Sequence, residues 1–188
     1  MDKQALRKKI KAKRLALSAA ELEAAAQRFC VQLQSYFTQV IAKAETQLKI
    51  GIYLANKGEL DLTPSIKWLW QKALSLYAPV LANTALNFHE WHPYTETVHN
   101  QFGLIEPTHS PMIAAADLDY VLVPLVAFNR QGQRLGMGKG YYDRTFAFRR
   151  DCSTPILIGC AYTFQEVTDL PTESHDMPLD FILTSNFY

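Results

Sequence analysis

The fold is decided around the stretch Gly132-Gln133-Arg134-Leu135-Gly136-Met137-Gly138-Lys139-Gly140-Tyr141-Tyr142-Asp143-Arg144, which holds four of the eight glycines of the chain. The apolar run before it, residues 120–126, predicts a buried strand, and residues 141–149 after it predict a helix. Glycine has no Cβ, so the backbone of such a loop can approach a ligand closely. A strand, a glycine loop and a helix in this order can place a phosphate at a helix N-terminus.

The charged side chains of the loop suit an anionic ligand. Arg134 and Lys139 supply positive charge, and Asp143 supplies a carboxylate that can hold Mg²⁺ beside a phosphate. The alternative is that the glycines only make tight surface turns. Two features favour a ligand site: the preceding strand is apolar throughout, and two adjacent tyrosines follow the glycines. The loop is not a Walker A motif, since no Ser or Thr follows Lys139, and its G-x-G-x-G spacing is not the Rossmann fingerprint.

Residues 123–144 resemble the signature of the 5-formyltetrahydrofolate cyclo-ligase family. The resemblance rests on Val123-Pro124-Leu125-Val126-Ala127-Phe128-Asn129 and on Gly132-x-Arg134-Leu135-Gly136-x-Gly138-x-Gly140-Tyr141-Tyr142-Asp143-Arg144. One position departs, because the family usually has Asp where Asn129 stands. Asn keeps the shape of that side chain and loses its charge.

The resemblance implies three sets of site residues. For ATP they are Lys3, Arg7, Arg134, Leu135, Gly136, Met137, Gly138, Lys139, Gly140, Tyr141 and Tyr142. For the folate substrate they are Leu54, Glu59, Met137, Tyr141 and Tyr142. For Mg²⁺ they are Asp143 and Asp176. The implied reaction converts 5-formyltetrahydrofolate and ATP to 5,10-methenyltetrahydrofolate, ADP and phosphate through a phosphorylated formyl group.

The N-terminal 17 residues carry seven Lys or Arg and one Asp, which gives a local charge of +6. Helical spacing predicts an apolar face made of Leu6, Ile10 and Leu17. The same spacing predicts a basic stripe beside that face, made of Lys3, Arg7, Lys11 and Arg14. A solvated helix face explains the other lysines of the segment, whereas the stripe can face a phosphate.

Apolar strands alternate with helices along most of the chain. This predicts an α/β three-layer sandwich with a mostly parallel central sheet flanked by helices. The predicted strands are residues 48–55, 75–81, 86–91, 120–126, 155–162 and 181–184. Predicted helices begin at a capping box at Ser18, at Thr63 as N-cap before Pro64, at residue 111 and at residue 141. Ligands of such sheets lie at the carboxyl ends of the strands, where the glycine loop, Glu59 and Asp176 can converge.

Length and composition predict a single domain over residues 1–188, with N-terminal helices in residues 1–45 packed on the α/β core. We expect a cytoplasmic monomer that binds small molecules. The net charge of +1 gives no general attraction to nucleic acid, and no apolar run is long enough to cross a membrane. Three cysteines lack metal-type spacing, which favours a reducing compartment.

Histidines 89, 92 and 99 lack the spacing of a metal site, and Trp91 suits the core better than a pterin site. Other functions remain open for the same predicted fold, because a fold does not fix a function. One is an enzyme of another class, such as a sugar-phosphate isomerase or a CoA-transferase-like enzyme. Another is a non-catalytic nucleotide-binding module.

Overall fold

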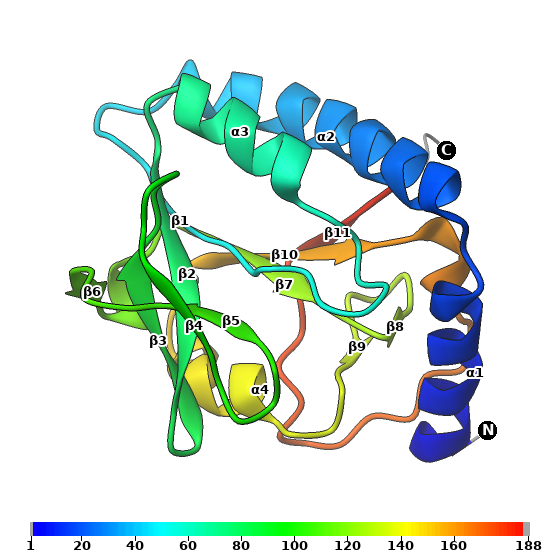
Figure 1. Cartoon of the computed structure of the whole chain (residues 1–188). Helices are drawn as coiled ribbons and strands as arrows, with labels where there is room; N and C mark the ends of the chain where they lie inside the picture. Colours follow the sequence, from blue (N-terminus) through cyan, green and yellow to red (C-terminus); the bar gives the residue numbers. More distant parts are fainter. Residues whose placement is uncertain (1, 186–188) are drawn as a thin grey trace.

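A seven-stranded sheet forms the centre of the computed structural model, which describes residues 2–185 (Figure 1). Its strand order is β11-β10-β7-β1-β2-β3-β6. The strands are β1 (Lys49–Gly51), β2 (Ser75–Ala82), β3 (Ala85–Glu90), β6 (Met112–Ile113), β7 (Tyr120–Pro124), β10 (Ile156–Ala161) and β11 (Phe181–Thr184). Five strands run parallel, whereas β3 pairs antiparallel with β2 and with β6. The predicted α/β fold with a mostly parallel sheet is confirmed.

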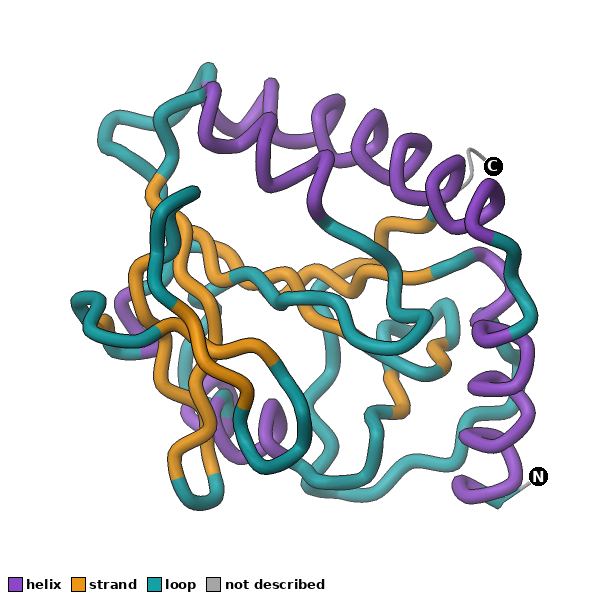
Figure 2. The backbone as a smooth tube through the Cα atoms, viewed as in Figure 1, coloured by secondary structure: helices purple, strands orange, loops and turns teal. Residues whose placement is uncertain are grey.

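The helices are unequally divided between the two faces of the sheet (Figures 1 and 2). Two long helices, α2 (Ala19–Ile41) and α3 (Thr63–Gln71), cover one face. The short helix α4 (Tyr141–Thr145) packs against the other face. The helix α1 (Lys3–Leu15) packs on a small hairpin of β8 (Ala127–Phe128) and β9 (Arg134–Leu135). The remaining elements are the hairpin of β4 (Thr97–His99) and β5 (Ile105–Pro107) and the 3₁₀ turns η1 (Ala115–Asp117), η2 (Ala147–Arg150) and η3 (Thr163–Gln165).

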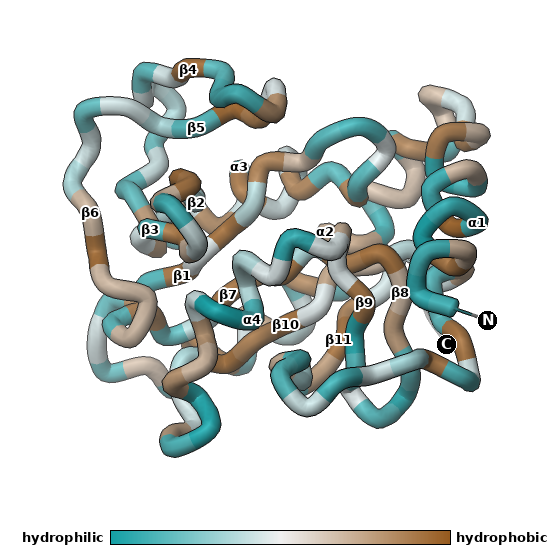
Figure 3. The backbone as a smooth tube through the Cα atoms, turned by 90° about the horizontal axis from the view of Figure 1, so that it is seen from below, coloured by the Kyte–Doolittle hydropathy of each residue, from teal (hydrophilic) through white to brown (hydrophobic). Residues whose placement is uncertain are grey.

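Burial of apolar side chains on both faces holds the sheet. Phe29, Leu33 and Phe37 of α2 are fully buried against one face, and Phe88 and Phe146 are fully buried on the other. Each such side chain contributes about 1.5–3 kcal/mol relative to full exposure. Buried β7 and β10 are accordingly coloured mostly as hydrophobic (Figure 3). Among the described residues, no helix has the length and hydropathy needed to cross a membrane.

Some predicted element boundaries are confirmed and others are wrong. The capping box of α2 is present: the Glu21 N–H donates to Ser18 Oγ at 3.3 Å, and the Ser18 N–H donates to Glu21 Oε2 at 2.8 Å. Thr63 is not the N-cap of α3, because Leu62 takes that position and the Thr63 N–H donates to Asp61 Oδ1 at 2.9 Å.

The helix predicted over residues 111–116 is wrong. Residues 112–113 form β6 against β3, and only the 3₁₀ turn η1 follows. Pairing with the edge of a sheet outweighs a weak local helix preference. The helix predicted over residues 141–149 is interrupted, because α4 ends at Thr145 and η2 begins at Ala147. The first strand is also shorter than predicted, since β1 ends at Gly51.

Gly132 lies in the hairpin turn between β8 and β9, with φ of +79°. A Cβ added there would lie 2.6 Å from the carbonyl oxygen of Leu179, a backbone atom that cannot turn aside. Gly103 has a similar φ of +71°, and an added Cβ would meet nothing within 4 Å. Gly103→Ala therefore isolates the cost of the left-handed backbone.

We predict that Gly103→Ala lowers the free energy of unfolding by about 1–2 kcal/mol. Gly132→Ala should cost about 1–3 kcal/mol more, because the new methyl group also displaces backbone. Urea denaturation of both variants and the unchanged protein measures the difference. Equal losses in the two variants would show that the approach to Leu179 is not a constraint.

Candidate active site

A cleft of about 850 Å³ opens at the carboxyl ends of the central strands. Its floor includes Leu54 after β1, Leu81 in β2 and Leu125 after β7. Its walls come from α1, the glycine loop, α4 and the β4–β5 hairpin. This volume is within the range of small-molecule sites, and the position is the one that a parallel sheet favours for a ligand.

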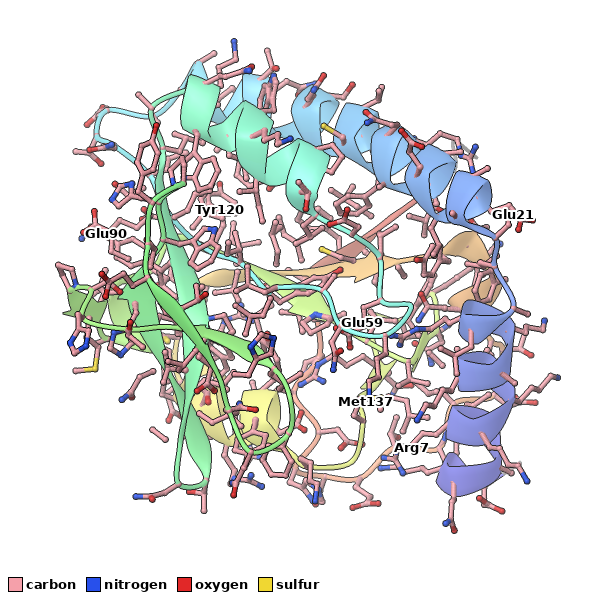
Figure 4. All side chains as sticks on the ribbon, viewed as in Figure 1. Arg7, Glu21, Glu59, Glu90, Tyr120 and Met137 are labelled. Carbon is pink, nitrogen blue, oxygen red and sulfur yellow. The ribbon has the colours of Figure 1, made fainter. Side chains whose placement is uncertain are left out.

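The cleft brings together every residue that the resemblance implies. They are Lys3, Arg7, Leu54, Glu59, Arg134, Leu135, Gly136, Met137, Gly138, Lys139, Gly140, Tyr141, Tyr142, Asp143 and Asp176. Figure 4 shows three of them, Arg7, Met137 and Glu59, which come from different segments and lie between α1 and the sheet. Convergence makes them one candidate site, and the ligand of each residue stays a prediction.

The glycine loop is fitted closely around a side chain of α1. The Arg7 Nε donates to the carbonyl oxygen of Gly136 at 2.9 Å. Gly138 has φ of +94°, and a Cβ there would lie 3.2 Å from Arg7 Cζ. A larger residue at position 138 would therefore be strained and would push the guanidinium away. Gly140, with φ of +67°, is the N-cap residue of α4.

The buried Arg134 and the partly buried Asp143 form an ion pair at the base of this loop. Arg134 Nη2 lies 2.7 Å from Asp143 Oδ1, and only 4% of the Arg134 side chain is exposed. The same Oδ1 accepts the Met177 N–H at 3.1 Å. The Arg134 Nε is buried and has no hydrogen-bond partner within residues 2–185. A buried donor without a partner is costly, which makes the ion pair with Asp143 important for holding this guanidinium in place.

Lys3 ties the start of α1 to the segment before β11. Its Nζ lies 3.0 Å from Asp176 Oδ2 and 2.9 Å from Glu173 Oε1. Burial opposes ionisation of Asp176, but the Glu173 N–H and the Lys3 charge outweigh burial and hold the pKa of that carboxyl below its usual value. Asp176 is therefore a carboxylate at neutral pH.

The donor set suits one kind of metal site. Asp143 and Asp176 both line the cleft, and Met177, the neighbour of Asp176, bonds to Asp143. No cluster of three or more His, Cys, Asp or Glu that could hold a metal occurs in the described part of the chain. Mg²⁺ is commonly held by one or two carboxylates together with phosphate oxygens and water. The two carboxylates fit that arrangement and do not form a complete protein cage.

Glu59 lies in another part of the cleft, in the turn that follows β1. Its Oε2 accepts the Asn56 N–H at 3.1 Å, and its Oε1 lies 3.6 Å from Arg14 Nη2. Burial raises the pKa of Glu59, and the Asn56 N–H and Arg14 oppose that rise. A partly buried carboxylate with unfilled acceptor capacity suits a ligand rich in N–H donors.

The two tyrosines after the glycines occupy different environments. Tyr142 packs against Phe146 with ring centroids 6.2 Å apart, and burial raises its pKa far above the usual value. Tyr141 lies under the Arg144 guanidinium, 5.4 Å from the ring centroid. The Tyr142 phenol is therefore neutral near pH 7 and can donate a hydrogen bond but not act as a base.

The β4–β5 hairpin contributes a wall of the cleft that the sequence analysis did not identify. Phe102, Leu104 and Ile105 line the cleft, and Phe102 is 47% exposed. Lys139 Nζ lies 5.8 Å from the centre of the Phe102 ring, which joins the hairpin to the glycine loop. The sequence carries no signal for this wall, because the exposure of Phe102 depends on how the hairpin folds over the cleft. Trp91, by contrast, packs against the core, as predicted.

Known proteins of similar sequence were compared with the chain. Residues 1–185 match the 5-formyltetrahydrofolate cyclo-ligase family. The chain belongs to this family. A 5-formyltetrahydrofolate cyclo-ligase from Escherichia coli (strain K12) is 34% identical over 180 residues, which cover 93% of this chain and 96% of that protein. One from Haemophilus influenzae is 40% identical over 139 residues, covering 71% and 74%.

Solved structures of similar fold carry names consistent with this family. A 5,10-methenyltetrahydrofolate synthetase from Mycoplasma pneumoniae matches with a TM-score of 0.79 at 28% identity, covering 99% of this chain and 100% of that one. The synthetase from Aquifex aeolicus matches with a TM-score of 0.83 at 32% identity, covering 100% and 91%. The resemblance inferred from the glycine loop is therefore confirmed, and it extends over the whole fold.

Asn129, where the family usually has Asp, is buried in the turn between β8 and β9. Its Oδ1 accepts the N–H groups of Gln131 and Gln133, each at 3.1 Å. Its Nδ2 donates to the Gln133 Oε1 at 2.6 Å. It does not line the cleft, so its role in the described structure is to hold this turn.

We predict that Asn129→Asp changes the free energy of unfolding by less than about 1 kcal/mol. The carboxylate keeps both backbone contacts, and the Gln133 amide can turn to donate to it. Asn129→Leu should cost about 1–3 kcal/mol, because it removes the side-chain acceptor that the Gln131 and Gln133 N–H groups share and leaves the Gln133 amide without its donor. Chemical denaturation measures both, and an equal loss in the two variants would contradict this account.

Proposed function

We propose that the chain is an ATP-dependent cyclo-ligase that converts 5-formyltetrahydrofolate to 5,10-methenyltetrahydrofolate with release of ADP and phosphate. Membership of the family supports the reaction class. The observation that carries the proposal is the convergence in one cleft of a cationic, glycine-rich side and a side with the partly buried carboxylate Glu59. The first side suits a polyphosphate, and the second suits a ring system with N–H donors.

The proposed reaction needs no nucleophile from the protein. The formyl oxygen attacks the γ-phosphorus of ATP, and the bond to the bridging oxygen breaks to release ADP. N10 of the folate then attacks the formyl carbon and loses its proton. The former formyl oxygen leaves as part of inorganic phosphate, and the methenyl bridge remains. The protein must therefore orient two substrates and stabilise charge on the transferring phosphoryl group.

The phosphate side of the proposed site is cationic. Lys3, Arg7 and Lys139 line it, together with backbone groups of the glycine loop. Arg134 also lines the cleft, and these cations would donate charge-assisted hydrogen bonds to phosphate oxygens. Such charge-assisted hydrogen bonds are about twice as strong as neutral ones.

The folate side of the proposed site is mainly apolar. Leu54 and Met137 line it, and Met137 is 56% exposed, which leaves its side chain free to cover a flat ring. Glu59 would accept hydrogen bonds from the pterin, and the neutral Tyr142 phenol would donate one near the formyl group. Tyr141 would border the p-aminobenzoyl part of the substrate.

Asp143 and Asp176 would hold Mg²⁺ together with phosphate oxygens. A bound Mg²⁺ neutralises charge that spreads over the transferring phosphoryl group. We further propose a cytoplasmic monomer that binds these small molecules and not nucleic acid. Its cysteines 30, 152 and 160 are all unpaired, which suits a reducing compartment, and its net charge is only +1.

We predict that the purified protein releases ADP from ATP only when 5-formyltetrahydrofolate is present. A coupled assay for ADP and the absorbance of the methenyl product should give one ADP per methenyl group, because the formyl oxygen is the only acceptor in the proposed reaction. A sugar phosphate and a CoA thioester, supplied in place of the folate, serve as controls. ADP release without folate, or product formation without ATP, would overturn the proposal.

The magnesium assignment gives a second prediction. Asp143→Asn and Asp176→Asn should each raise the Mg²⁺ concentration that gives half-maximal rate, since each removes one ligand charge. If the two carboxylates share one ion, their effects on transition-state free energy should not add in the double variant. Asp117→Asn, which changes a carboxylate outside the cleft, is the control. Additive losses with an unchanged Mg²⁺ requirement would mean that they do not share a metal.

A further inference from the structure

Arg14 is a buried cation at the end of α1. It is 5% exposed, although both of its chain neighbours, Lys13 and Leu15, are exposed. The sequence places it in the basic stripe of α1, and the structure turns it toward the loop after β1. Its Nε donates to the carbonyl oxygen of Gly58 at 2.9 Å. A cation is rarely buried unless it is paired, so this placement calls for a reason.

The last turn of α1 lies directly on the turn that carries Glu59. Gly58 has φ of +76°, and a Cβ added there would lie 3.2 Å from the Arg14 carbonyl oxygen. The turn is closed by a hydrogen bond from the Glu59 N–H to the Asn56 carbonyl at 3.0 Å. The backbone of Glu59 is also fixed from the other side, because the Tyr162 hydroxyl donates to its carbonyl oxygen at 3.2 Å.

The two oxygens of the Glu59 carboxylate are held differently. Oε2 accepts the Asn56 N–H at 3.1 Å. Oε1 lies 3.6 Å from Arg14 Nη2, which is too long for a hydrogen bond but close enough for strong attraction in a buried site. Arg14 thus offsets the cost of burying the charge and leaves Oε1 able to accept a hydrogen bond from a ligand. Both side chains line the cleft.

We propose that Arg14 is a positioning residue that keeps the Glu59 carboxylate ionised and aimed at the folate. The proposal rests on the function proposed above, in which Glu59 binds that substrate. This role differs from the roles proposed for Lys3 and Arg7, which belong to the same helix but line the phosphate side of the cleft. Arg14 acts through Glu59, so its removal affects one substrate and not the other.

The test compares Arg14→Gln, Arg14→Lys and Lys9→Gln, the last being a control that removes an exposed cation from the same helix. Arg14→Gln should raise the KM for 5-formyltetrahydrofolate by about tenfold to a hundredfold, the effect expected for a contact with a charged group. The KM for ATP should change less than about twofold. Arg14→Lys keeps the charge and should recover part of the folate affinity, and Lys9→Gln should leave both constants unchanged.

A double-variant cycle separates positioning from a structural role. In a Glu59→Gln background, Arg14→Gln should raise the folate KM by less than about twofold, because its target is already gone. Full additivity, or equal increases in both KM values, would overturn the proposal. If Arg14→Gln fails to fold, as judged by thermal unfolding, Arg14→Lys and its own cycle with Glu59→Gln decide in the same way.

The outcomes also distinguish this inference from the function on which it rests. Absence of folate-dependent ADP release by the unchanged protein refutes the proposed function before any variant is made. Normal activity of the unchanged protein with an unaltered folate KM in both Arg14 variants refutes only the role of Arg14.

Discussion

Arg134 and Asp143 lie nine residues apart and meet in an ion pair of 2.7 Å that closes the glycine loop between them. Loss of one partner of a buried pair leaves an uncompensated charge and typically costs about 3–5 kcal/mol. The same Asp143 oxygen accepts the Met177 N–H, so this pair also positions the segment that carries Asp176. This one carboxylate thus joins the glycine loop, α4 and the segment before β11.

Helix α1 completes what this ion pair begins. Its apolar face, Leu6 and Ile10, packs on the β8–β9 hairpin, while its basic stripe faces the cleft. Lys3 and Arg14 are eleven residues apart, which is about 16 Å along a helix. One rigid element therefore reaches both the glycine loop and the Glu59 turn of the cleft, and its docking helps to set their separation.

The sequence predicts the parts of this structure that local rules control. The apolar run at residues 181–184 predicts a strand, and the capping box at Ser18 predicts the start of a helix. Both predictions are confirmed. Residues 111–116 are predicted wrongly because sheet pairing at an edge is invisible in a local pattern. The cleft residues were identified through the resemblance. Phe102 was missed because its exposure depends on how the β4–β5 hairpin that carries it folds over the cleft.

The contacts that fix α1 have a consequence for the order in which the protein is made. Arg14 donates to Gly58, which lies 44 positions later in the chain. Arg7 donates to Gly136, 129 positions later, and Lys3 donates to Asp176, 173 positions later. During synthesis from the N-terminus, α1 emerges first but must wait for almost the whole chain before its last partner exists. The basic helix is thus the first part of the cleft to be synthesised, and its full docking is among the last steps of folding.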